Sequence, residues 1–292
     1  MWLFGSPDPI SDFTANPDND LTKWTGSWAD YIKTYLWTLF LYEQYGGRVG
    51  KDLIHNIVAS PRVSIEGVDS AFAATGLTQR FADVLDQWVL ADCINDTTFL
   101  GGRYGYYGDS VPRFNNVGWY VSYPVSRTGS LDRWAGEYLL FQKGRNLELE
   151  FDGNDAAEFH VFVVAKDTQG HRLLLDTMAL DSLQAGSMSV PGSDTGYQSV
   201  WLVPVSHYPN GRMSYAYSAG AAGVAEGSLK PQASSCKPTG PTFVRAGARL
   251  KLPAGAVLRG PDGRTVDRNA LSAGIYWIAM KGSPSRKIVV VP

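Results

Sequence analysis

The first third of the chain carries the apolar spacing of amphipathic helices. Apolar side chains recur every three or four positions, which predicts one helix with a wide apolar face: Trp28, Tyr31, Ile32, Tyr35, Leu36, Leu39 and Phe40. Gly46-Gly47 would end this helix. Four polar residues before it could cap its amino end, namely Asn19, Asp20, Thr22 and Thr25. Similar patterns predict helices near residues 53–58, 68–72 and 78–89, so residues 1–112 form a mostly helical subdomain.

From residue 117 onward the pattern changes to short, β-rich apolar runs. A glycine-rich loop at residues 101–108 separates the two patterns. Eight runs, separated by turn sequences, predict strands at residues 119–123, 137–142, 147–151, 160–164, 173–175, 187–190, 199–205 and 214–217. This number and spacing of strands are typical of an antiparallel β-sandwich or jelly roll, here over residues 117–219.

The remaining residues predict a linker and a small β-module. Residues 220–241 are rich in Gly, Ala, Ser and Pro and offer little to bury, as in a linker. Residues 242–292 predict four strands, at 249–252, 257–259, 275–280 and 286–291. The predicted fold class is therefore α+β and multidomain: a helical subdomain, then an antiparallel β-sandwich, then a small carboxy-terminal β-module.

Composition narrows the classes of partner. The net charge is −2 and no basic stripe is present, so we expect no nucleic-acid partner. The longest strongly apolar run, residues 35–42, is far shorter than the roughly 20 residues of a membrane span. Many Tyr, Ser, Thr and Gly residues and few Lys favour an extracellular protein. Residues 1–7 do not read as a signal peptide, so either the protein is cytoplasmic or Met1 is not the natural start.

No catalytic motif is complete in the sequence. The four histidines are His55, His160, His171 and His207, and none has a second ligand at helical spacing. A His-Glu-x-x-His motif is absent, so a zinc-peptidase site cannot be built from this chain, and we expect no metal or cofactor in it. His55, His160 and His207 are interpreted as surface or half-buried side chains. Cys93 and Cys236 could form one disulfide.

Two polar or aromatic groups could bind a ligand. Asp152, Asn154 and Asp155 could gather oxygen ligands for calcium, although a polar turn between strands explains them as well. Four aromatic residues could stack on a sugar if exposed, although packing in the core or a surface Tyr explains them too: Trp201, Tyr208, Tyr215 and Tyr217.

Residues 31–47 resemble a helix of the gluzincin metallopeptidases. The zinc aminopeptidases of that group carry a Tyr-x-Lys-Gly motif, which Tyr31-Ile32-Lys33 matches and from which Thr34 departs. In that family the motif Tyr donates a hydrogen bond to the oxyanion of the tetrahedral intermediate. The resemblance therefore implies that Tyr31 is a catalytic residue, with Lys33 as the motif Lys.

A broader resemblance covers residues 1–219. Residues 16–31, 41–47, 81–88 and 102–106 resemble the part of large secreted bacterial metallopeptidases that follows the zinc site, and a β-sandwich often comes next. Residues 271–276 and 286–290 are similar to the sorting modules of type IX secreted proteins. A generic hairpin would also give this tail pattern.

These resemblances predict the non-catalytic carboxy-terminal part of a secreted zinc metallopeptidase. The chain would be inactive alone, because its zinc site would lie in an upstream catalytic half, and it would be secreted or at the cell surface. Its partners would be that half or a peptide substrate. The alternative is a β-sandwich protein that binds a glycan or a surface polymer.

Overall fold

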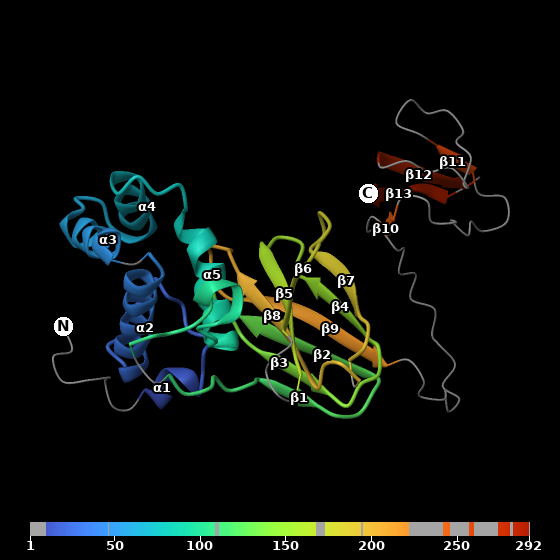
Figure 1. Cartoon of the computed structure of the whole chain (residues 1–292), viewed down its shortest axis with the longest axis horizontal. Coiled ribbons are helices and arrows are strands. Elements are labelled where there is room, and N and C mark those ends of the chain that lie inside the picture. The colour runs from blue at the N-terminus through green and yellow to red at the C-terminus, as the bar shows by residue number, and fades with distance from the viewer. Residues whose placement is uncertain are drawn as a thin grey trace. The chain divides into compact units, whose positions relative to one another are not determined.

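In the computed structural model the chain divides into two compact units, Met1–Ala225 and Glu226–Pro292. The structure describes residues 10–45, 47–108, 111–167, 173–193 and 195–221 of the first unit, and four strands of the second. Figure 1 shows the helices and the two layers of strands in the first unit.

The four predicted helices are present. α2 (Trp28–Gln44), α3 (Gly47–Ala59), α4 (Ser64–Ala74) and α5 (Phe81–Ile94) follow a short α1 (Ser11–Thr14), which the apolar pattern did not predict. A 3₁₀ turn, η1 (Phe99–Gly102), lies in the predicted glycine-rich loop. Ser27 caps α2, in place of the four polar residues expected to do so: its side chain accepts the backbone N–H of Asp30, whose carboxylate accepts the N–H of Ser27. None of the described helices combines the length and apolar character needed to cross a bilayer.

Nine strands of the first unit form two sheets that face each other, which confirms the predicted β-sandwich. They are β1 (Gly118–Tyr120), β2 (Val125–Leu131), β3 (Leu139–Gln142), β4 (Leu147–Gly153), β5 (Phe159–Lys166), β6 (Leu173–Met178), β7 (Ala185–Val190), β8 (Ser199–Ser206) and β9 (Met213–Ala221). One sheet has the order β1-β3-β8-β5-β6 and the other β2-β9-β4-β7. All neighbours are antiparallel except β1 and β3.

β2 is the strand that the apolar pattern did not predict. Its two end residues, Val125 and Leu131, are buried, and Ser126, Arg127 and Thr128 between them are exposed. A strand whose middle faces solvent on both sides shows no apolar alternation. β2 is held in place by pairing with β9 along its whole length, which is a tertiary contact.

The helices cover the outer face of the five-stranded sheet, so this unit has three layers. Alternate residues of β5 and β8 face the other sheet, and the residues between them join the helices in a second core; Phe162, Val164, Val203 and Val205 lie on this helix-facing side. The segments predicted as two domains, 1–112 and 117–219, therefore share one hydrophobic core within one unit.

α5 is the helix that binds the helical layer to the sheet. The hydroxyl of Tyr138 donates to the Val89 carbonyl at 3.1 Å, and the ammonium of Lys166 donates to the Ile94 carbonyl at 2.5 Å, at the carboxyl end of the helix. Gly136 allows close approach, since a Cβ there would come within 2.4 Å of Val89. These contacts hold α5 against the five-stranded sheet.

The second unit contains a four-stranded sheet in the order β10-β13-β12-β11. Its strands are β10 (Thr242–Arg245), β11 (Val257–Arg259), β12 (Gly274–Met280) and β13 (Ser283–Val291). Three of them match predicted strands, while β10, which pairs in parallel with β13, was not predicted. The strand predicted at 249–252 and residues 222–241 of the predicted linker lie outside the described residues.

Candidate functional site

The amino end of α2 presents a cluster of exposed aromatic side chains, which we call the α2 aromatic patch: Trp24, Trp28 and Tyr31. The Tyr31 ring lies 4.7 Å from Trp24 and 5.6 Å from Trp28, between ring centroids. Tyr31 is 45% exposed, and within the described part of the chain its hydroxyl makes no hydrogen bond. Tyr31, the catalytic candidate that the resemblance implies, is thus a phenol that packs against two indole rings and is open to solvent.

The apolar face of α2 is only partly buried. Ile32, Leu36 and Phe40 are fully buried in the helical core, as the periodicity predicts. Trp28 and Tyr31, expected on the same apolar face, are instead exposed at the amino end of the helix. Further along, Tyr35 and Leu39 are half-buried and pack against the core, and Tyr42 is exposed separately, at 43%.

Lys33, the second motif residue, is buried beneath the patch. Its ammonium lies 2.6 Å from Asp30 Oδ1 and 2.6 Å from Asn19 Oδ1, and it also donates to the backbone carbonyls of Asp20 and Lys23. Burial by itself raises the pKa of Asp30, but hydrogen bonds from Lys33 and Thr25 outweigh it and hold that pKa well below its ordinary value. Lys33 therefore fixes the chain before α2 and does not face solvent.

The segment before α2 is also tied to the sandwich. Asp20 accepts from Arg133 Nε at 2.5 Å, and Asp18 pairs with Arg212. The Leu21 N–H donates to the Trp134 carbonyl at 3.2 Å. These contacts, made by the residues that carry the broader resemblance, position the α2 aromatic patch relative to the rest of the unit.

A second group of functional side chains lies where α5 meets the sheet. Asp86 of α5, His160 of β5 and His207, just after β8, each point a ligand atom at the others, and all three atoms lie within 4.8 Å of one another. His160 Nδ1 donates to Asp86 Oδ2 and His207 Nε2 donates to Asp86 Oδ1, both at 2.7 Å. The imidazoles stack, with centroids 3.9 Å apart.

The electrostatics of this cluster follow from the shared carboxylate. Its hydrogen bond raises the pKa of His160, because it stabilises the charged imidazolium more than partial burial disfavours it. Burial by itself raises the pKa of Asp86, but the two histidine hydrogen bonds outweigh it and leave that pKa lowered. His160 is half-buried, as expected, whereas His207 is buried, and the fold brings the two histidines together on one carboxylate.

This cluster has almost no sequence signal. Asp86 is 74 residues from His160 and 121 from His207, so no spacing rule joins them. The one hint is His160 itself, a polar residue on the same side of β5 as the apolar, helix-facing Phe162 and Val164.

The candidate calcium ligands lie at and just after the carboxyl end of β4. Asn154 Oδ1 accepts the Ala156 N–H in a tight turn after β4, and Asp152 and Asp155 are exposed, which favours the polar-turn interpretation of this segment. Tyr215 and Tyr217 are buried in the sandwich core and cannot stack on a sugar.

Cys93 is a free thiol in the described residues, and burial raises its pKa to about 12. Its proposed partner Cys236 lies outside the described residues.

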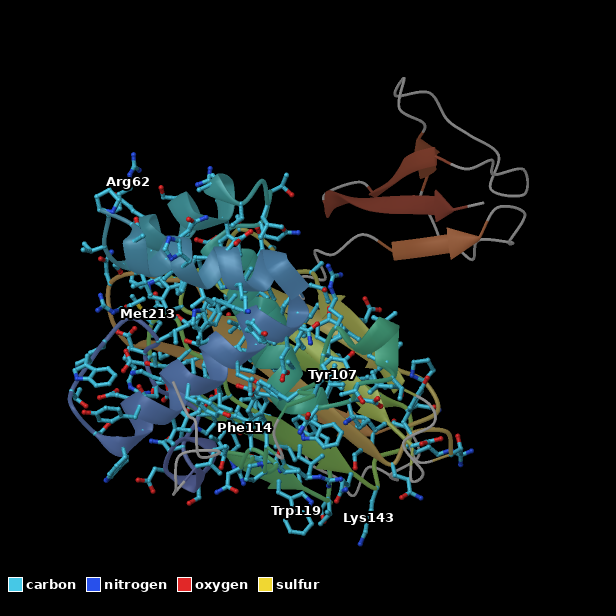
Figure 2. All side chains as sticks on the ribbon, turned by 60° about the vertical axis from the view of Figure 1, so that its left-hand side comes forward. Arg62, Tyr107, Phe114, Trp119, Lys143 and Met213 are labelled. Carbon is cyan, nitrogen blue, oxygen red and sulfur yellow. The ribbon has the colours of Figure 1, made fainter. Side chains whose placement is uncertain are left out.

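The sheet carries one exposed tryptophan that the sequence analysis did not single out as a ligand candidate. Trp119 is 69% exposed and projects from the rim of the unit, near Lys143 (Figure 2). The strand register places it in one cross-strand row with Leu140 and the half-buried Trp201. Trp119 Nε1 donates to Gln142 Oε1 at 2.9 Å, and Gln142 Nε2 donates to Ser199 at 2.8 Å.

No protein-family model matches the sequence, and no curated protein matches it. Among solved structures, parts of the chain are similar to the pre-peptidase C-terminal domain of a collagenase from Bacillus anthracis (13% identity, 36% of this chain and 92% of that one, TM-score 0.26). They are also similar to AlgX of Pseudomonas aeruginosa (12% identity, 47% and 40%, TM-score 0.25). A carbohydrate-binding module of the β-sandwich superfamily matches at 6% identity over 32% and 51% of the two chains, with a TM-score of 0.21. Each of these similarities covers less than half of this chain. The fold is therefore described by its own strand order.

Proposed function

We propose that this chain is the non-catalytic, carboxy-terminal part of a secreted gluzincin-type zinc metallopeptidase. Its helices would form the floor of a substrate cleft whose zinc ligands lie in an upstream catalytic half. The observation that carries the proposal is the α2 aromatic patch, where the residue matched to the motif Tyr is exposed beside two tryptophans.

The chemistry of the patch suits a covered cleft. Exposed apolar patches can mark surfaces that contact another molecule, and the α2 aromatic patch places Trp24, Trp28 and Tyr31 together at the surface. A phenol O–H held at a fixed position can donate to the negative charge that develops on a peptide carbonyl oxygen. Tyr31 stands on a helix whose first turn is fixed by Ser27 and by buried Lys33, so its position is preorganised.

The proposal requires that the chain alone does not cleave peptide bonds. Its sequence contains no His-Glu-x-x-His motif, so the ion that would activate the attacking water is supplied by the upstream half. The first experiment is to read the coding sequence upstream of Met1. An in-frame His-Glu-x-x-His followed by a Glu ligand supports the proposal, whereas a stop codon close upstream contradicts it.

In the protein joined to that half, Tyr31→Phe should lower kcat about 100-fold or more with little change in KM, since the lost hydrogen bond forms in the transition state. Tyr42→Phe is the matched control, because Tyr42 has a similar exposure on the same helix and should keep wild-type rates. Equal rates for the two variants would remove Tyr31 from the catalytic machinery.

A second candidate function, recognition of a glycan by the β-sandwich, rests on a different surface. Trp119 offers an open indole face, and its neighbours Gln142 and Ser199 offer amide and hydroxyl groups at the same rim. An aromatic face flanked by such groups can stack on a sugar ring and bond its hydroxyls. Buried Tyr215 and Tyr217 take no part in this surface.

A further inference from the structure

We infer that Asp86, His160 and His207 form a binding site for a divalent transition-metal ion of the zinc class, which fastens α5 to the five-stranded sheet. This inference is independent of the proposed peptidase role. It concerns residues distant in sequence from Tyr31, and it assigns no catalysis to the ion.

The donor set is the one such ions prefer. Two imidazole nitrogens and one carboxylate oxygen are common zinc ligands, at about 2.0–2.2 Å from the ion. All three ligand atoms already lie within 4.8 Å of one another. A tetrahedral ion at such distances holds its donor atoms about 3.4 Å apart, so the two 2.7 Å contacts to Asp86 would lengthen, and any wider separation would shorten, as the ion binds.

Two of the three ligands are held in place before any ion arrives. His207 is 4% exposed, its backbone N–H donates to the Glu158 carbonyl at 2.8 Å, and its ring lies 5.9 Å from that of Trp134. Asp86 is fixed on α5, which is bonded to the sheet through Tyr138 and Lys166. Such anchoring of ligand side chains lowers the cost of ordering them when an ion binds.

The third ligand, His160, leaves the site open to solvent. The His160 side chain is 44% exposed, so an ion can enter from solvent on that side and keep a water as its fourth ligand. Because the three ligands come from α5, β5 and the end of β8, the bound ion would cross-link the helical layer to two neighbouring strands of the sheet.

The test is titration of the metal-free chain, prepared without a polyhistidine tag, with Zn²⁺ in a calorimeter. Wild type should bind one equivalent. His160→Gln should bind at least about tenfold more weakly, because a direct ligand is lost, and a half-exposed position tolerates this change without unfolding. His55→Ala, at an exposed histidine of α3 outside the cluster, should bind as wild type does.

Two further readouts separate a built site from scattered surface histidines. Zn²⁺ should raise the midpoint of thermal unfolding of wild type and of His55→Ala but not of His160→Gln, since binding to the folded state alone stabilises it. Co²⁺ should give a visible absorption band that Asp86→Asn weakens. Absence of saturable binding, or equal affinity in wild type and His160→Gln, would overturn the inference. Neither result bears on whether Tyr31 assists peptide cleavage.

Discussion

At the residue scale, Glu137 is an ionisable group buried just before β3. Its backbone N–H donates to the Pro204 carbonyl, and burial, together with the nearby charge of Asp18, raises the pKa of its carboxyl to about 8 in spite of Arg212. The folded state therefore keeps a proton that the unfolded chain releases near the ordinary glutamate pKa of 4.5. The stability this provides is complete below that value and is lost as pH rises to about 8.

We therefore expect the free energy of unfolding of wild type to fall, relative to Glu137→Gln, as pH rises from about 4.5 to about 8, by up to about 1.4 kcal/mol per pH unit. The glutamine is neutral at every pH and lacks this decline. Urea unfolding at several pH values measures it. Glu150→Gln, at an exposed position of β4, is the control and should follow wild type. Parallel curves for wild type and Glu137→Gln would show that the carboxyl is not protonated in the folded state.

At the element scale, α2 is positioned by buried polar groups as well as by its apolar side chains. The Lys33 ammonium connects the first turn of the helix to the segment before it. It donates to Asp30 within the helix and to Asn19 and two backbone carbonyls in that segment. Removing one partner of a buried ion pair leaves the other charge without compensation, which costs more than the pair contributes.

Lys33→Met should accordingly lower the free energy of unfolding by about 3–5 kcal/mol, because Asp30 stays buried and three further acceptors lose their donor. Lys51→Met, at an exposed site of α3, should change it by less than about 0.5 kcal/mol. Chemical denaturation of both variants is the measurement. A loss in Lys33→Met no larger than in Lys51→Met would mean that the cage of acceptors contributes little.

At the scale of the whole molecule, the described part of the first unit exposes aromatic side chains at the α2 aromatic patch and at the rim around Trp119. Under the two proposals, the patch would contact an upstream protein half, or the rim would contact a sugar. Which surface meets a partner decides between the two candidate functions.

If the glycan function holds, wild type should bind at least one polysaccharide of a broad panel, and Trp119→Ala should weaken that binding about tenfold or more, since stacking on an indole would supply much of the affinity. Tyr107→Ala, at another exposed aromatic, is the control. Affinity electrophoresis gives the comparison. No binding by wild type, or binding that survives Trp119→Ala, would remove this surface as a glycan site.

Much of this architecture can be predicted from local pattern. The helices around Leu53, Phe72 and Trp88 follow apolar spacing that only a helix can bury on one side, and eight strands of the sandwich follow period-two or continuous apolar runs. Alternation also places His160 on the helix-facing side of β5, although it does not say what that side meets.

What the sequence determined by itself is the set of elements whose own side chains must be buried, together with the lack of a zinc-peptidase motif. The tertiary structure alone decided that the amino end of the α2 apolar face stays exposed, and it paired the polar strand β2 with β9. It also brought Asp86, His160 and His207 within 4.8 Å of one another. The reason is physical: burial of a periodic face is a local property, whereas strand pairing and convergence of polar groups depend on which distant segments pack together.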